Sequence, residues 1–236
     1  MRRMTRLIAV GVAAIALLML GQLPTARADT VSYSITSPNS ALSGFTGPYG
    51  TATVTLTSST TATITFTSNT VGGNIYLMGD GGSVAVNVAA SSFNVGTITG
   101  SNAGTGFTPG PFTAASGNED GFGAFNLRID SFDGFSHSSD TISFTVTNTS
   151  GTWASAGVVL AANGSGAFAA MHVFVTSSPA NASNTVLVTG FAANGGAVAT
   201  PEPSSLMLFG LGLLALGFIM RRQLLPSEDS DSRLAA

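Results

Sequence analysis

The chain has 236 residues, a formal net charge of −3, 8% charged residues and no cysteine. This length suits one domain with appendages, and the lack of cysteine excludes disulfides, thiolate metal sites and cysteine nucleophiles. Seven acidic residues and a single basic one, Arg128, lie between residues 29 and 200. That balance argues against nucleic-acid binding, because phosphate backbones are held by positive charge.

The N-terminus has the three parts of a secretory signal peptide. A basic start precedes an uncharged apolar run at residues 7–20, and the small residues Ala26 and Ala28 place the predicted cleavage before Asp29. An uncleaved anchor is the alternative, but the apolar run is shorter than the roughly 20 residues of a membrane span. We therefore expect the Sec machinery to export the chain and signal peptidase to remove residues 1–28.

Alternation with a period of two dominates residues 29–199. Residues 51–57 and 61–67 alternate threonine with apolar side chains, and the short gap between them predicts a β-hairpin. We expect further strands at residues 31–36, 74–78, 83–89, 93–99, 123–130, 141–147, 154–160, 167–176 and 185–191.

Clusters of Gly, Asn, Ser and Pro separate these segments, as expected between antiparallel strands. No helical periodicity is visible between the two ends of the chain. The sequence therefore predicts an all-β exported domain at residues 29–199, an antiparallel β-sandwich of the jelly-roll or immunoglobulin-like type. A parallel β-solenoid is the alternative, and the lack of a fixed-length repeat argues against it.

Most of the domain's carboxylates lie between residues 118 and 140. Oxygen ligands in glycine-rich loops are what Ca²⁺ requires, so a calcium site is one interpretation and a solvated acidic edge is the other. The candidate ligands are Glu119, Asp120, Asp130 and Asp133.

Other candidates for chemistry are sparse. Residues 164–166 do not form a nucleophile elbow, and His137 and His172 are isolated. Glycosidases need paired carboxylates with more aromatic lining than this composition offers. Trp153 is either a core anchor or a sugar-stacking platform. Threonine rows can bind ice, but threonine is also a common exposed strand residue, which is the interpretation we prefer.

The C-terminal region combines three features in order. Pro201, Glu202 and Pro203 form a rigid extended segment. An apolar stretch at residues 204–220 follows, and as a transmembrane helix it would cover about 25 Å. Arg221 and Arg222 then favour retention of this end in the cytoplasm, with the domain on the other side of the membrane.

This arrangement at residues 200–222 resembles the PEP-CTERM sorting signal of Gram-negative bacteria that make exopolysaccharide. The resemblance implies that an exosortase, a membrane cysteine transpeptidase, acts near the Pro-Glu-Pro segment and removes the helix. The protein would then pass from the inner membrane to the cell surface or matrix. Residues 223–236 depart from the family, whose members usually end soon after the arginines, and we expect this acidic cytoplasmic tail to be disordered.

Together these features predict an exported, non-enzymatic surface or matrix protein without a cofactor other than a candidate Ca²⁺. Its expected partners are an exosortase, the export machinery, the membrane and exopolysaccharide. The alternatives are a carbohydrate- or calcium-binding adhesion module, a glycan-active enzyme and an ice-binding protein.

Overall fold

The computed structural model describes residues 29–199, and its regular elements there are thirteen β-strands and three single-turn 3-10 helices. The all-β prediction is confirmed. The strands are β1 (Asp29–Pro38), β2 (Gly50–Leu56), β3 (Thr61–Ser68), β4 (Thr70–Val71), β5 (Asn74–Met78), β6 (Val84–Val86), β7 (Phe93–Val95), β8 (Thr99–Ser101), β9 (Thr113–Glu119), β10 (Gly123–Asp130), β11 (Thr141–Asn148), β12 (Ala169–Ser177) and β13 (Val188–Ala199).

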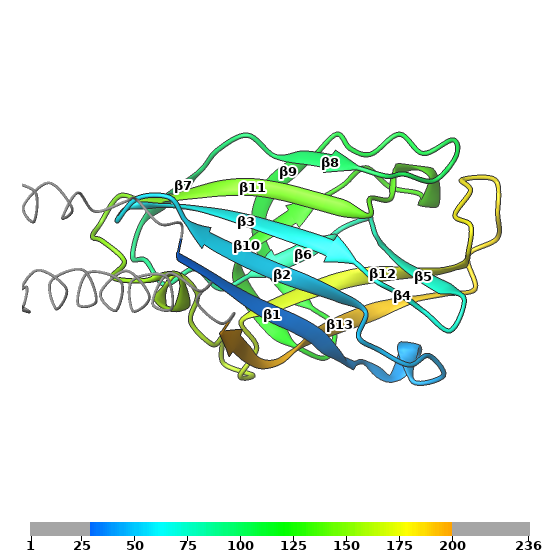
Figure 1. The fold of residues 1–236 in the computed structure, drawn as a ribbon, viewed down its shortest axis with the longest axis horizontal. Helices are drawn as coiled ribbons and strands as arrows, with labels where there is room; N and C mark the ends of the chain where they lie inside the picture. Colours follow the sequence, from blue (N-terminus) through cyan, green and yellow to red (C-terminus); the bar gives the residue numbers. More distant parts are fainter. Residues whose placement is uncertain (1–28, 200–236) are drawn as a thin grey trace, which may run out of the picture. The chain divides into compact units, whose positions relative to one another are not determined.

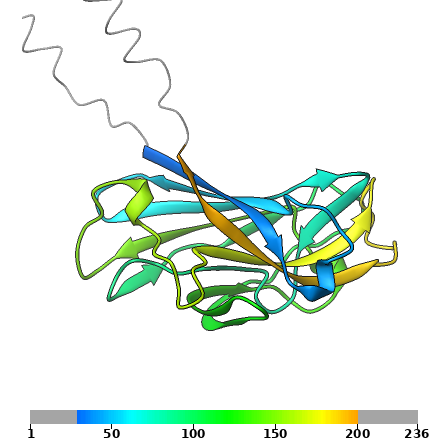
Figure 2. The ribbon, with the colours of Figure 1, turned by 90° about the horizontal axis from the view of Figure 1, so that it is seen from below.

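These strands form one hydrogen-bonded sheet in the order β7-β11-β3-β2-β1-β13-β12-β6-β10-β9, with β4, β5 and β8 attached beside it. The sheet folds back on itself into two layers, so that β1, β2, β3 and β11 face β6, β10 and β12 (Figures 1 and 2). Strand β13 joins the layers, because its first half pairs with β12 and its second half with β1.

The layered arrangement therefore follows the predicted sandwich in outline, but one continuous sheet replaces two separate ones. Every pairing between named strands is antiparallel. This finding contradicts the parallel solenoid alternative.

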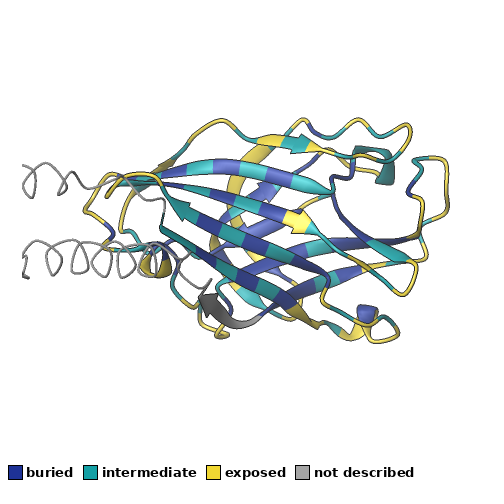
Figure 3. Cartoon of the chain, in the orientation of Figure 1, coloured by how far each residue is buried: buried dark blue, intermediate teal, exposed yellow. Residues whose placement is uncertain are grey.

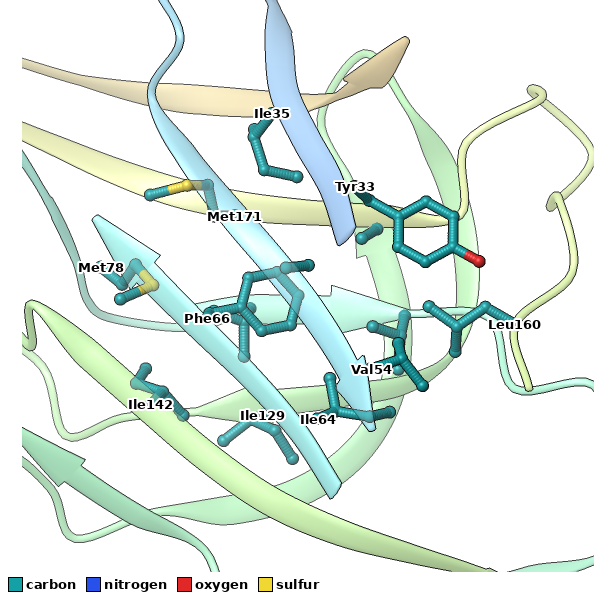
Figure 4. Close-up of a cluster of buried hydrophobic side chains, with 14 of the residues drawn as sticks. Tyr33, Ile35, Val54, Ile64, Phe66, Met78, Ile129, Ile142, Leu160 and Met171 are labelled. Carbon is teal, nitrogen blue, oxygen red and sulfur yellow. The ribbon is translucent and has the colours of Figure 1, made fainter. Parts of the chain in front are cut away.

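The core lies between the two layers. Strands β2, β3 and β11 bury every second residue, which appears as alternating colours along each ribbon (Figure 3). Phe66 of β3 and Ile142 of β11 lie within the same buried cluster as Ile129 of β10 and Met171 of β12 (Figure 4). Each large apolar side chain buried in this way contributes about 1.5–3 kcal/mol to folding, so the alternation seen in the sequence fixes which face of each strand points inward.

Two strand predictions need correction. Residues 154–160 were expected to form a strand, but they contain a 3-10 turn, η3 (Ala156–Val158). Trp153, Ala156 and Val159 are all buried, and this spacing of three matches a 3-10 turn, in which residues three apart share a face. Residues 93–99 divide into β7 and β8, and Gly96 between them lies so close to Thr145 that a side chain there would clash.

Strand β9 was not predicted at all. All but two of its seven residues are exposed, and most of its side chains are small, so the segment carries no alternation of apolar and polar residues. Its hydrogen bonds to β10 create the strand.

The predicted signal segment 1–28, sorting segment 200–222 with its helix at 204–220, and tail 223–236 lie outside the described residues. Within residues 29–199, no helix has the length and apolar character needed to cross a membrane.

Candidate functional site

A groove lined by both polar and apolar residues opens where β3 ends and β11 begins. It has a volume of about 450 Å³. Five segments of the described chain form its walls: the end of β3 with β4, strand β5, the loop at residues 102–105, the start of β11 and the loop at residues 178–180. The lining includes six residues with hydroxyl side chains: Thr67, Ser68, Thr70, Thr105, Thr141 and Ser178.

Among residues 29–199, Asp140 is the one ionisable side chain that lines the groove. One carboxylate oxygen, Oδ2, accepts a hydrogen bond from the Ala103 backbone N–H at 2.6 Å, and Oδ1 accepts one from the Ser101 hydroxyl at 3.3 Å. The backbone carbonyl of Asp140 accepts from the Ser68 N–H, and its N–H donates to the Ser101 carbonyl, both at 2.8 Å. The carboxylate is therefore held in one orientation before any ligand arrives.

The neighbouring Asn102 fixes the loop that forms one wall. Its side-chain Nδ2 donates to the Ser138 carbonyl at 2.8 Å, and its Oδ1 accepts from the Gly104 N–H at 2.9 Å. Ile75 and Leu77 also line the groove and belong to a second cluster of hydrophobic residues that includes Phe174. Leu77 is completely buried, whereas Ile75 is partly exposed, so the groove combines polar groups with some apolar surface.

Two columns of hydroxyl groups run along the outer face of the sheet and end at this groove. The cross-strand pairs are Thr61–Thr147, Thr63–Thr145, Thr65–Ser143 and Thr67–Thr141, on β3 and β11 respectively. We call these eight residues the hydroxyl track. The hydroxyls of Thr65 and Ser143 are 2.9 Å apart and hydrogen-bonded. With residues two apart on a strand separated by about 6.8 Å, the track is about 20 Å long.

The track is the central part of a wider uncharged face. Strand β2 presents Thr51, Thr53 and Thr55 beside it, and β1 continues the rows with more hydroxyl side chains. The Ser32 and Thr53 hydroxyl oxygens lie 3.2 Å apart. The alternation predicted at residues 51–57 and 61–67 therefore produces a regular array of hydroxyls across four strands.

The four predicted calcium ligands do not gather around one point. Asp130 accepts a hydrogen bond from the Gly82 N–H at 2.7 Å and forms an ion pair with Arg128 at 2.8 Å. Asp120 accepts a hydrogen bond from the Asn39 side chain, and Asp133 is exposed. In the part of the chain that the structure describes, no three acidic or histidine side chains lie close enough to hold a metal ion.

Glu119, the fourth candidate, is completely buried, and neither of its carboxylate oxygens has a hydrogen-bond partner among the described residues. This burial raises the pKa of Glu119 to about 8; nearby Arg128 partly offsets the rise, and Asp130 adds to it. At neutral pH the side chain is therefore mainly protonated, which removes the charge that a cation would need.

The remaining candidates have structural roles. Trp153 is 4% exposed, and its indole N–H donates to the Ala89 carbonyl at 2.8 Å. The core-anchor interpretation is thus confirmed and the sugar-platform interpretation is wrong. His172 stacks on Phe191 with ring centroids 4.3 Å apart, and burial lowers its pKa. The His137 ring lies 2.8 Å from the carbonyl oxygen of Gly110.

Asp29, the first residue after the predicted signal cleavage, begins β1, and its carboxylate accepts a hydrogen bond from the Ala156 N–H. Ala26 and Ala28 lie outside the described residues. So do the sorting residues Pro201, Glu202, Pro203, Arg221 and Arg222.

Comparison with known protein families gives a match that includes these sorting residues. The model of the PEP-CTERM protein-sorting motif matches residues 199–223. The chain carries a PEP-CTERM sorting motif. The motif implies export, membrane-associated sorting and processing by an exosortase, as the resemblance in the sequence suggested. No curated protein and no solved structure matches the chain.

The groove itself was not predicted. The sequence identified Asp140 only as one of several acidic residues, because nothing in it indicates that the 102–105 and 178–180 loops meet at the start of β11. The threonine rows were the one sequence feature that could have indicated the groove, because their last cross-strand pair, Thr67 and Thr141, lies there.

Proposed function

We propose that the chain is an exported, non-enzymatic surface or extracellular-matrix protein that an exosortase sorts through its C-terminal tail. The observation that carries this proposal is the PEP-CTERM match at residues 199–223. In this account the Sec machinery exports the chain, signal peptidase cleaves before Asp29, and the helix at residues 204–220 holds the protein in the inner membrane until the exosortase acts near Pro201.

The geometry of the acidic groups supports a non-enzymatic role. Hydrolysis of glycosides usually employs two carboxyl groups across the scissile bond. Of the described carboxylates, Asp140 alone lines the groove, and its two oxygens already accept hydrogen bonds from the protein. Glu119 has the raised pKa that a general acid requires, but it is completely buried. A substrate would not reach it without displacement of the surrounding chain.

The charge and surface of the domain support residence in a polysaccharide matrix. The region from residue 29 to residue 199 has seven acidic residues and one basic residue, a difference of −6, and the outer face of β1, β2, β3 and β11 displays hydroxyls. Such a surface is hydrated without attracting nucleic acid or anionic lipid. We infer that the processed protein is retained in, or released into, exopolysaccharide.

The proposal can be tested by fractionating the producing cells with and without their exosortase gene. We expect the protein at the surface or in the medium of the parent strain, and in the membrane fraction when the exosortase is missing. Replacement of Pro201, Glu202 and Pro203 by alanine should have the same effect, while export continues. Equal release from the parent strain, the exosortase mutant and the alanine variant would show that the tail is irrelevant to sorting. Retention in the membrane fraction of all three would show that the tail is a permanent anchor.

A further inference from the structure

The lining of the groove suits an uncharged ligand with many hydroxyl groups. The side chains of Thr67, Thr141 and Ser178 can each donate and accept hydrogen bonds, as sugar hydroxyls do. Ile75, which is partly exposed, and the exposed Pro179 supply apolar surface for the C–H face of a sugar ring. The volume of about 450 Å³ lies within the range of about 300–1,000 Å³ that is common for small-molecule sites.

The charge of the groove and of the domain further limits the class of ligand that can bind. None of the described residues that line the groove is basic, and the net charge of residues 29–199 is −6, from one basic and seven acidic residues. A phosphorylated or carboxylated ligand would therefore be repelled rather than bound. A cation would find only Asp140, whose carboxylate already accepts hydrogen bonds from Ala103 and Ser101. These features favour a neutral saccharide.

The hydroxyl track extends the groove in one direction. Thr67 and Thr141 belong to both, and the pairs behind them continue along β3 and β11 for about 20 Å with no charged or bulky side chain. An extended polymer with one segment in the groove would meet hydroxyls at a regular spacing along this path. The continuity of groove and track indicates a chain of several sugar units rather than a single sugar.

We propose that the groove binds a segment of a neutral polysaccharide and that the following sugar units lie along the hydroxyl track. This inference rests on the proposed function in one respect: the domain meets extracellular polysaccharide only if it is exported. Binding is measured on the purified protein and sorting is measured in the producing cells, so one test can fail while the other succeeds.

The experiment uses the full chain, purified in a zwitterionic detergent that contains no sugar, with neutral tri- and hexasaccharides of glucose, galactose, mannose and N-acetylglucosamine as probes. Isothermal titration calorimetry should detect binding of at least one hexasaccharide, and more weakly of its trisaccharide. The double variant Thr67→Val with Thr141→Val removes two groove hydroxyls at nearly constant volume. It should weaken binding of both lengths about tenfold, as expected for two lost hydrogen bonds.

The double variant Thr63→Val with Thr145→Val tests the track. It should weaken binding of the hexasaccharide several-fold and leave the trisaccharide unchanged. The matched control is Ser32→Ala with Ser34→Ala, which alters hydroxyls on the same face of the sheet on β1, one strand further from the track than β2. Its affinity for both lengths should equal that of the wild type, and equal melting temperatures show that each variant is folded.

Three results would overturn the proposal: no binding of any probe, equal losses in the β1 control, or binding of an oligolysine peptide in place of the saccharides. The last would mean that Asp140 makes the groove a site for cationic peptides. None of these results would affect the sorting proposal, which is read from the cellular location of the protein.

Discussion

Replacing Glu119 by glutamine should change how the stability of the domain depends on pH. The carboxyl group is buried without a hydrogen-bond partner among residues 29–199, and its pKa in the folded protein is about 8 against an ordinary value of 4.5. The folded state therefore binds this proton more tightly than the unfolded state. The resulting stability is fully present below pH 4.5, is lost progressively as the pH rises from 4.5 to about 8, and is absent above that.

The magnitude follows from the same two values. Stability should fall by about 1.4 kcal/mol per pH unit within this window, with a total of about 5 kcal/mol as an upper bound. Glutamine has nearly the same shape and no titration. We therefore expect the Glu119→Gln variant to match the wild type near pH 4.5 and to be more stable by several kcal/mol at pH 9.

Urea unfolding of residues 29–199 between pH 4.5 and pH 9, followed by the fluorescence of the single, buried Trp153, measures this difference. The contribution of His172 to the stability of the domain changes in the opposite direction, because burial lowers its pKa and this contribution is lost as the pH falls below the ordinary value of 6.5. His172 is present in both proteins, so its contribution cancels in the comparison. The exposed Asp133→Asn variant is the control and should follow the wild type. Parallel pH profiles for the wild type and Glu119→Gln would refute the reasoning.

Further predictions concern the neighbourhood of Glu119, the core and the calcium hypothesis. Gly82→Ala should destabilise the domain by about 1–3 kcal/mol in urea unfolding, because Gly82 has φ +71° and an added Cβ would clash with the Glu119 carboxyl; an unchanged midpoint would contradict this. Trp153→Phe should cost about 1 kcal/mol by leaving the partly buried Ala89 carbonyl without its donor, and a near-neutral effect would show that water replaces the indole. Addition of Ca²⁺ or EDTA should leave the thermal melting temperature unchanged, since the acidic side chains of the described domain do not converge; a site filled at a hundred times its dissociation constant would instead add about 2.7 kcal/mol.

The sequence predicted the hairpin of β2 and β3 because threonine and apolar residues alternate strictly there, and alternation decides which side chains point inward. It failed at residues 154–160 because a run of small and apolar residues fits a strand or a 3-10 turn equally well, and only the packing of Ala156 and Val159 selects the turn. Strand β9 gave no signal because its exposed, small residues have no apolar face.

The candidate functional residues were likewise predictable only where the pattern is local in the sequence. The hydroxyl track was implicit in the threonine rows, but the alignment of β3 with β11 depends on a pairing between segments almost eighty residues apart. The burial of Glu119 could not be foreseen, since its neighbours Asn118 and Asp120 are exposed and the cover over its carboxyl comes from other parts of the chain. The sorting motif was fully visible in the sequence because its three parts are contiguous and need no tertiary contact.

The most direct test of the central claim is the intact mass of the protein released from the producing cell. If an exosortase sorts this chain, the released form should begin at Asp29, end near the Pro-Glu-Pro segment and lack residues 204–220. A released form whose mass still includes residues 204–220 would contradict the account.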